Sequence, residues 1–486
     1  MKKTTKIILY TLIIIISLSF SISAQTESFS PQFFRELADV VNKEPEIEIP
    51  DYQLLKLDNG MKFYLAQDKS LPIFEIRGYI DGGKINENQN NAGITSLMTE
   101  IMLLETANYS EQELSLFKEL NGLSLNLGVG SDRINFRGNS LSTESSELLS
   151  LLSEVLRRPE FKGNHLERTV KEYQQLYRQQ FYDDSALLDM YFFKNLYGEH
   201  PYGYNYNYNL ILDFLDQLKA EELENFYQKH INPEEIVIAV SGDFEMKTVK
   251  EKLKNEFSDW KNNKEESNIK HVNVNPKIHN KIILVNKADA TQANIRMGYN
   301  FYSNKYPKRI PFMMGNLIFG SGGFNSRLME NLRSDKGYVY GTNAQTRYHD
   351  YGGAYYVNLS LEPEKALAGM EAVEKEMLKI KKAEKPLAEE ELFENINYYN
   401  AVFPKAYQHQ IEVLDELVYQ KEFYNRSDDY LNNFIKQYNG LEADQVQQIF
   451  AEELYPDVIF TVIVGPKDKI LPQFKEADLE VELINN

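Results

Sequence analysis

The chain has 486 residues, of which 42% are hydrophobic and 12% aromatic. This length and composition are enough to bury two or three substantial cores, so the sequence describes a large globular protein and not a disordered one. The formal net charge of −19 repels phosphate backbones, which argues against nucleic acid as a partner. Cysteine is absent, which excludes disulfides and a thiol nucleophile.

The N-terminus has the layout of a secretory signal peptide. A lysine-rich start precedes an apolar run from Ile7 to about Ile22, and the small residues Ser23 and Ala24 follow. We expect a signal peptide at residues 1–24, export to the periplasm, and no stable membrane insertion after cleavage. The alternative is an uncleaved N-terminal membrane anchor, although the run is shorter than the ~20 residues that a spanning helix needs.

The next part of the chain predicts hairpins followed by helices. In 52–68, YQLLKLDNGMKFYLAQD, two apolar stretches flank an Asp-Asn-Gly turn, which is the pattern of a β-hairpin. The segment 73–80, IFEIRGYI, predicts another strand. The segment 92–105, AGITSLMTEIMLLE, has apolar residues at helical spacing and predicts a helix with one buried face. Further strands and then long helices are expected to about residue 231.

The segment 322–341, GGFNSRLMENLRSDKGYVYG, predicts a helix between glycines and then a strand. The apolar positions that recur every four residues on one face of this helix are Phe324, Leu328 and Leu332. Gly337 ends the helix where a left-handed residue is wanted. Arg333 and Tyr340, which flank this turn, are needed for neither role. If both are purely structural, Arg333 is a cation that suits the dipole at a helix C-terminus and Tyr340 is a half-buried strand tyrosine.

An internal repeat gives the domain organisation. The segments 218–244, LKAEELENFYQKHINPEEIVIAVSGDF, and 441–467, LEADQVQQIFAEELYPDVIFTVIVGPK, align without a gap. Each predicts a helix, a proline break, an apolar strand and a glycine turn. A weaker echo pairs IRGY at 76–79 with IRMGY at 295–299.

The polar stretch between the two copies has no apolar periodicity, as is typical of a linker. We therefore expect two tandem homologous domains at 45–262 and 279–486, joined by a linker at 263–278. Because strands come as hairpins and helices as runs, the expected fold class is α+β, with a mostly antiparallel sheet covered by helices in each domain.

The common catalytic motifs are absent from the sequence. There is no HExxH, GxSxG, Walker-type or CxxC motif, and the 7 histidines never fall three to five residues apart, which excludes a local histidine-based metal site. The segment 320–326, GSGGFNS, suggests phosphate binding at a helix N-terminus, but it lacks the P-loop lysine and the Rossmann spacing. Flexible backbone at a helix start is the better interpretation.

Several segments together resemble the pitrilysin/insulinase family of zinc metallopeptidases, including mitochondrial-processing-peptidase-like proteins. They are SGGFNSRLMENLRSDKGYVYG, the paired endings VIAVSGDF and FTVIVGPK, and NNAGITSLMTEIMLLET. The resemblance covers nearly the whole mature chain and implies a half-clamshell of two domains.

In the family, the second domain supplies an arginine and a tyrosine, seven residues apart, that touch the substrate backbone. Arg333 and Tyr340 have that spacing and context. Gly320, Gly322 and Gly323 lie where processing-peptidase relatives have a glycine-rich substrate loop, although this loop is shorter.

The zinc half of the pattern departs from the family, in which a first-domain helix carries the inverted motif HxxEH. Aligned with it, GITSLMTE places Ser96 and Glu100 at the two histidine positions and Thr99 at the catalytic glutamate. Serine is a poor zinc ligand, and threonine cannot act as the general base that activates metal-bound water.

The family's third zinc ligand is a glutamate on a downstream helix, and its position here is expected within 169–184, TVKEYQQLYRQQFYDD. The register favours Gln175 or Leu176, with Glu172 as a close alternative. The resemblance therefore implies that this chain binds no metal and that zinc is held by a partner subunit.

Two functional hypotheses follow. The first is a non-zinc subunit of an exported heterodimeric zinc metalloendopeptidase, in which Arg333 and Tyr340 act on peptide substrates in trans to a homologous subunit with an intact HxxEH motif. The second is a catalytically inert structural or peptide-binding protein on the same fold. Retention of the arginine and the tyrosine favours the first, because a scaffold does not require them.

Overall fold

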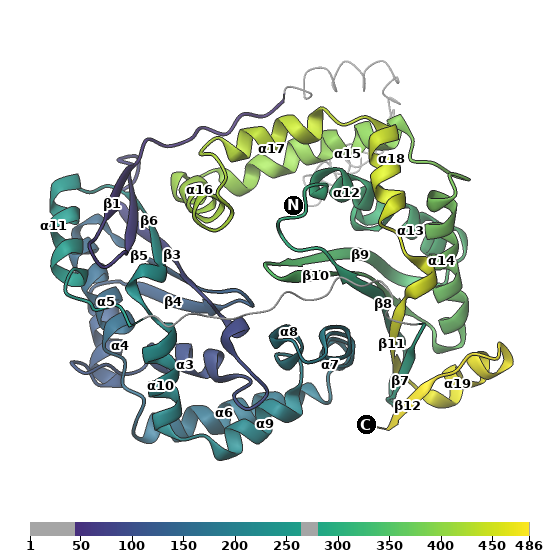
Figure 1. Ribbon diagram of the computed structural model, residues 1–486, viewed down its shortest axis with the longest axis horizontal. Helices are drawn as coiled ribbons and strands as arrows, with labels where there is room; N and C mark the ends of the chain where they lie inside the picture. The colour runs from purple at the N-terminus through teal and green to yellow at the C-terminus, as the bar shows by residue number, and fades with distance from the viewer. Residues whose placement is uncertain (1–43, 264–279, 486) are drawn as a thin grey trace, which may run out of the picture. The chain divides into compact units, whose positions relative to one another are not determined.

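The computed structural model describes residues 44–263 and 280–485. The predicted signal peptide and all but the first residue of the predicted linker lie outside these ranges. From Pro45 onward the chain forms one compact unit, which contains two six-stranded sheets (Figure 1). Within the described ranges, no helix is long and apolar enough to cross a membrane.

The first sheet has the strand order β1-β2-β6-β3-β5-β4. Its strands are β1 (Gln53–Lys56), β2 (Lys62–Gln67), β3 (Ile73–Asp81), β4 (Ser124–Val129), β5 (Arg133–Leu141) and β6 (Ile236–Gly242). The helices of the first half are α3 (Ile94–Met102), α4 (Glu111–Leu120), α5 (Ser145–Arg157), α6 (Asn164–Gln180), α7 (Asp184–Tyr197), α8 (Pro201–Tyr204), α9 (Tyr208–Gln217), α10 (Ala220–His230) and α11 (Met246–Phe257).

The second sheet has the strand order β12-β7-β11-β8-β10-β9. Its strands are β7 (Ile282–Asn286), β8 (Ala293–Phe301), β9 (Val339–His349), β10 (Gly352–Leu361), β11 (Phe460–Gly465) and β12 (Glu482–Asn485). The helices of the second half are α12 (Arg309–Asn316), α13 (Arg327–Met329), α14 (Ala366–Lys381), α15 (Glu389–Val402), α16 (Gln410–Tyr424), α17 (Tyr430–Asn439), α18 (Ala443–Glu452) and α19 (Lys467–Glu476).

These elements confirm the predicted fold class. The expected first hairpin is the antiparallel pair β1 and β2, with Leu54 opposite Tyr64. Most strand pairs are antiparallel, and the parallel ones are β2 with β6 and β7 with β11 and β12. The repeat is present as α10 followed by β6 in the first half and α18 followed by β11 in the second.

The strands of the repeat are buried on both faces. Every residue of β6, IVIAVSG, is buried, and so is every residue of β11, FTVIVG. A strand that is covered on both faces reads as a continuous apolar run and not as an alternating one, which explains the apolar strands of the repeat.

One face of each sheet is covered by a helix from the other half of the chain. Helix α16, which belongs to the second half, packs on β6, β3 and β2 of the first sheet (Figure 1). The buried cluster between them combines Tyr64, Ala66, Val237 and Ala239 of the sheet with Ile411, Leu414, Leu417 and Val418 of the helix. Helix α7 of the first half packs in the same way on β8 and β11 of the second sheet, where Phe192 stacks on Phe460 with ring centroids 5.5 Å apart.

The packing of α16 on the first sheet can be tested by shortening a buried side chain in the cluster between them. Leu414→Ala removes a fully buried side chain of α16 and should cost about 2–5 kcal/mol of stability. The loss should appear as faster amide hydrogen exchange in β6, which is distant in sequence from the mutation. Leu120→Ala, at a position that is 76% exposed, is the matched control and should leave exchange in β6 unchanged. Exchange that rises only within α16 would contradict the shared core.

Candidate functional site

The helix at the position of the family's zinc motif, α3, is held at its N-terminus by a buried glutamate. The carboxylate of Glu87 accepts hydrogen bonds from the backbone N–H groups of Gly93, at 2.8 Å, and Thr95, at 3.1 Å. Burial raises the pKa of Glu87. The carboxylate satisfies N–H groups that have no partner within the helix, at the end where the helix dipole is positive. The helix therefore keeps its place in the fold.

The side chains at the motif positions of α3 do not form a metal site. Thr99 is buried, and its hydroxyl donates to the backbone carbonyls of Thr95 and Ser96, each at 3.0 Å. Ser96 is half-buried and Glu100 is exposed. The threonine at the place of the catalytic base is thus bonded to its own helix and has no proton-accepting role.

The neighbouring helix α6 presents a tyrosine to α3. The hydroxyl of Tyr173 donates to the carbonyl of Ser96 at 3.2 Å. Burial, with a smaller contribution from the nearby Glu100 carboxylate, raises the pKa of Tyr173 to about 12, so the phenol remains protonated at neutral pH. A protonated phenol is a hydrogen-bond donor and not a zinc ligand.

The three positions considered for the third ligand are all exposed. Gln175 and Leu176 are exposed. The side chain of Glu172 is 64% exposed, and its carboxylate lies 3.8 Å from Nε of Arg168 on its own helix. Within the described ranges, no group of three or more His, Cys, Asp or Glu residues could hold a metal ion. Zinc, which the family resemblance implies, does not fit this set of side chains.

The segment 322–341 differs in part from its expected structure. Phe324 does not lie on a buried helix face: it belongs to a short 3-10 helix (Gly323–Asn325) and is 74% exposed. Leu328 and Leu332 are buried as expected. A single α-turn, α13, passes into a π-helical segment (Glu330–Asp335), and Gly337, at φ +62°, follows it as expected.

Arg333 lies in this π-helical segment and is exposed. Its guanidinium carbon lies 4.8 Å from the centroid of the Phe324 ring. A π-helix is rare, and it often occurs at functional sites because it changes the direction of side chains relative to a regular helix. Arg333 contributes nothing to the core, so the irregular turn presents it to solvent.

Tyr340 is presented by a second irregularity, a β-bulge in β9. In the pairing of β9 with β10, Gly341 lies opposite Ser360 and Val339 lies opposite Leu361, so Tyr340 has no partner between them. Its side chain is 61% exposed. A bulge adds one residue to a strand and redirects the side chain there. Because β9 is also the edge strand of its sheet, Tyr340 is open to an approaching molecule.

The three glycines of the predicted substrate loop have different local causes. A Cβ on Gly320 would lie 2.7 Å from Cβ of Ala344, and one on Gly322 would lie 2.5 Å from the carbonyl oxygen of Leu317. Close packing therefore explains these two. Gly323 has φ +68° with open space around it, so its backbone conformation is what requires glycine.

Arg327, which sequence reasoning missed, fixes this segment to α15. Arg327 is buried, forms an ion pair with Glu391, and donates to the carbonyls of Lys385, at 2.6 Å, and Pro386, at 2.7 Å. A buried guanidinium needs such a set of acceptors. The segment that carries Arg333 is therefore anchored at its start.

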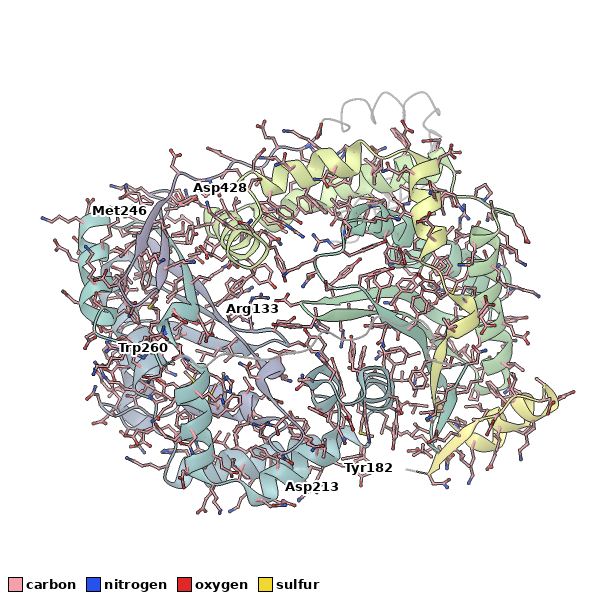
Figure 2. The ribbon with its side chains drawn as sticks, viewed as in Figure 1. Arg133, Tyr182, Asp213, Met246, Trp260 and Asp428 are labelled. Atoms are coloured by element: carbon pink, nitrogen blue, oxygen red, sulfur yellow. The ribbon has the colours of Figure 1, made fainter. Side chains whose placement is uncertain are left out.

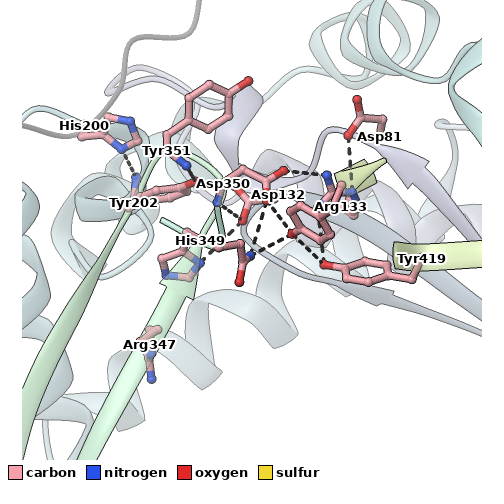
Figure 3. A network of polar contacts seen from close by, with 12 residues as sticks. Asp81, Asp132, Arg133, His200, Tyr202, Arg347, His349, Asp350, Tyr351 and Tyr419 are labelled. Atoms are coloured by element: carbon pink, nitrogen blue, oxygen red, sulfur yellow. Dashed lines mark hydrogen bonds and ion pairs between the residues drawn. The ribbon is translucent and has the colours of Figure 1, made fainter. Parts of the chain in front are cut away.

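A polar cluster joins the β4–β5 hairpin to the β9–β10 hairpin (Figure 3). Asp132 accepts a hydrogen bond from the backbone N–H of Asp350 at 3.1 Å, and Nδ1 of His349 lies 3.6 Å from the same carboxylate oxygen. Arg133 pairs with the Asp350 carboxylate, and Tyr202 donates to Asp132. Equivalent turns of the two halves thus contact each other, and the side-chain sticks show Arg133 on the first-sheet side of this contact (Figure 2). These hairpin-turn residues carried no recognisable motif in the sequence.

A cavity of about 1140 Å³ lies beside this cluster and is lined by residues of both halves. Its charged lining residues include more carboxylates than cations; the carboxylates are Asp81, Glu87, Asp132, Glu199, Glu222, Glu235, Asp350 and Glu422. Neither Ser96 and Glu100 nor Arg333 and Tyr340 are among its lining residues. The cavity reaches α3 only at its first residue, Ile94.

The structure has two similar α+β halves. One half has a helix at the zinc-motif position, and the other has an exposed arginine and tyrosine. This is the arrangement of a metallopeptidase-like chain whose described residues include no group of side chains that could hold a metal. Comparison with known families agrees: the model described as "Insulinase (Peptidase family M16)" matches residues 63–206, and that described as "Peptidase M16 inactive domain" matches residues 217–397. The chain belongs to peptidase family M16.

Some of its relatives are named as proteases and others as non-peptidase homologues. The "Uncharacterized zinc protease YmxG" of Bacillus subtilis is 20% identical over 60% of this chain and 70% of its own length. The "Non-peptidase homolog YmxG" of Helicobacter pylori is 22% identical over 66% of this chain and 73% of its own length. A "peptidase M16 inactive domain" from Pseudomonas fluorescens shares the fold, with a TM-score of 0.77 and 20% identity over 86% of this chain and 98% of that one.

Metal removal should leave the stability of this chain unchanged. Because no described group of side chains could hold zinc, dialysis against EDTA and addition of zinc should each leave the melting temperature of the isolated chain as it was. Differential scanning calorimetry measures this directly. A melting temperature that rises with zinc concentration would reveal a metal site in the native state.

The contact between the hairpins predicts a pH-dependent stability. Burial of Asp132 opposes its ionisation, but the neighbouring His349 and the hydrogen bonds from Tyr202 and from the backbone N–H of Asp350 outweigh it and lower the Asp132 pKa below 3.8. A lowered pKa stabilises the native state above pH 3.8, and this stability is lost as the pH falls through the native value. Asp132→Asn should therefore lower the free energy of unfolding at pH 7 by roughly 1–3 kcal/mol.

Thermal unfolding between pH 3 and pH 7 tests this expectation. The difference between Asp132→Asn and wild type should shrink once the pH falls below 3.8. Asp213→Asn, at an exposed position on α9, serves as the control and should follow the wild-type profile. A difference that is constant with pH would show that the Asp132 charge does not stabilise the hairpin contact.

Proposed function

We propose that this chain is the non-zinc subunit of an exported heterodimeric zinc metalloendopeptidase. In this proposal a homologous subunit with an intact HxxEH motif binds zinc. The present chain supplies Arg333 and Tyr340 as contacts to the peptide substrate in trans. Export, with the periplasm as the location, rests on the N-terminal sequence pattern.

The observation that carries the proposal is the exposure of Arg333 and Tyr340 in a chain whose α3 has no metal-binding set. Both side chains stand on irregular backbone, a π-helical turn and a β-bulge, and neither packs in the core. A chain that served only as a scaffold would gain nothing from an exposed cation and an exposed phenol at such positions.

The chemistry of the two groups suits a peptide substrate. A guanidinium offers N–H donors in a fixed plane, and a phenol offers one O–H donor. Placed against a peptide carbonyl, such donors hold the substrate in register and stabilise the negative charge that develops on the oxygen during attack. Neither role requires that the donors and the metal belong to the same chain.

The second candidate is an inert peptide-binding or structural protein on the same fold. The name "Non-peptidase homolog" of the Helicobacter pylori relative favours it. The two candidates differ in one measurable respect, because only the first requires that Arg333 and Tyr340 affect the turnover of a complex.

Partner capture and mutation decide between the candidates. The tagged chain is purified from its native cell envelope, and the eluate is assayed for zinc and for cleavage of an internally quenched peptide library. We expect a co-purifying subunit with an HxxEH motif, with zinc and cleavage in the eluate but not in the lone chain. An eluate without partner or activity would support the inert protein.

In the reconstituted pair, Arg333→Ala should lower kcat/KM roughly 10²-fold, as does removal of a donor to a developing oxyanion. Tyr340→Phe should lower kcat/KM about tenfold, the effect of one lost hydrogen bond. The matched controls are Arg178→Ala and Tyr182→Phe at exposed positions, which should leave turnover unchanged. Circular dichroism should show all four variants folded. Wild-type turnover in both Arg333→Ala and Tyr340→Phe would remove the in-trans role.

A further inference from the structure

We infer that Phe324 is a positioning residue for Arg333 and that Gly341 keeps the space beside Tyr340 open, so that the four residues form one subsite for an extended peptide backbone. The inference rests on the proposed function and adds two residues to it. Phe324 is 74% exposed, although its place in the sequence predicts a buried helix face. Packing in the core therefore does not account for it.

The Phe324 ring contacts the Arg333 guanidinium. Glu330 lies three residues before Arg333 and Asp335 two residues after it, but the ion pairs of the described residues do not include Arg333. The guanidinium carbon lies 4.8 Å from the ring centroid instead. An exposed arginine next to two carboxylates is thus directed by an aromatic face.

Stacking on a ring orients a guanidinium without using its hydrogen-bond donors. A carboxylate would accept two of the five N–H groups, whereas a ring contacts the flat face and leaves the N–H groups in the plane free. The arrangement of Arg333 on Phe324 therefore fixes the direction of the donors and keeps them available. This is the property required of a group that binds peptide carbonyls.

The turn that carries Phe324 is itself fixed. The hydroxyl of the buried Ser326 donates to the carbonyl of Gly323 at 2.8 Å, which closes the turn. Gly323 has φ +68°, a conformation that favours glycine. The ring is thus placed by a turn that is pinned at one end, and it is not carried on a free loop.

Gly341 is the independent observation. Its φ lies outside the left-handed range, and nothing lies within 4 Å of where its Cβ would be. Neither backbone conformation nor internal packing therefore requires glycine next to Tyr340. The missing side chain leaves room at the bulge on the edge strand, where an extended chain could approach Tyr340 closely.

A double-mutant cycle in the reconstituted pair tests whether Phe324 acts through Arg333. Phe324→Leu should lower kcat/KM about two- to fivefold, the scale of an exposed cation–π contact, and Phe324→Tyr should restore it. In an Arg333→Ala background, Phe324→Leu should have no further effect. Gly341→Val should raise KM by crowding the subsite, whereas Asn126→Val, at an exposed position on β4, the edge strand of the first sheet, should not.

The outcomes separate the inference from the proposed function. If Arg333→Ala leaves turnover unchanged, the proposed function fails. If Arg333→Ala lowers turnover but the loss from Phe324→Leu is equally large with and without Arg333, only the positioning role is overturned. If Gly341→Val has the wild-type KM, the inference that the space beside Gly341 belongs to the subsite is wrong.

A partner-free measurement tests the stack itself. In a ¹H–¹⁵N spectrum of the arginine side chains of the lone chain, the Nε–H signal that disappears in Arg333→Lys should be displaced by the ring current of Phe324. Phe324→Leu should move it to the position of an exposed arginine. A signal unchanged by Phe324→Leu would overturn the positioning role whether or not a partner exists.

Discussion

The central strands β6 and β11 are buried on both faces. Each sheet would therefore leave one apolar face uncovered if only its own half of the chain packed on it. The second face is covered by a helix of the other half, α16 on the first sheet and α7 on the second. This exchange is the constraint on which the rest of the structure depends. It makes the two halves one hydrophobic structure, since the cluster of the first half also includes Phe460 and Val462 of β11.

Each exchanged helix also forms an ion pair with the sheet it covers, and the two arginines involved occupy equivalent positions of the internal repeat. Arg77 on β3 lies 3.5 Å from Asp415 on α16, and Arg296, its counterpart in the weaker sequence echo, pairs with Asp189 on α7. Burying a charge is costly unless it is paired. Each arginine therefore favours the packing of a helix that places an aspartate beside it. Burial raises the pKa of Asp415 even though Tyr79 and Arg77 lower it, which shows how far the site is removed from water.

Much of the fold could be predicted from sequence because its signals are local. The Asp-Asn-Gly turn, the proline breaks and the apolar strands each determine structure within about ten residues. The exchanged helices and the contact of Asp132 with Asp350 could not be predicted, because they join residues far apart in the chain. The echo of Arg77 in Arg296 was visible, but a repeat does not reveal which partner each copy has.

The local structure around the candidate site was only partly predicted. The spacing of Arg333 and Tyr340 made them candidates, both side chains are exposed, and their role stays a prediction. Phe324 was assigned to a buried helix face because a repeat of four assumes a regular helix. The chain instead forms a 3-10 turn and a π-helical segment. On α6, Tyr173 and not Gln175 or Leu176 reaches α3, since side-chain direction depends on helix rotation.

The zinc-motif helix α3 and the pair Arg333 and Tyr340 therefore differ in what their side chains do. At α3, the hydroxyl of Thr99 and the phenol of Tyr173 donate to backbone carbonyls, so these two side chains belong to the packing of the helix. At Arg333 and Tyr340, the polar groups face solvent from a π-helical turn and a bulge, each of which interrupts the regular hydrogen-bond pattern of its element. Packing accounts for the first arrangement. It does not account for the exposed side chains of Arg333 and Tyr340, for which a contact to a peptide substrate remains our proposal.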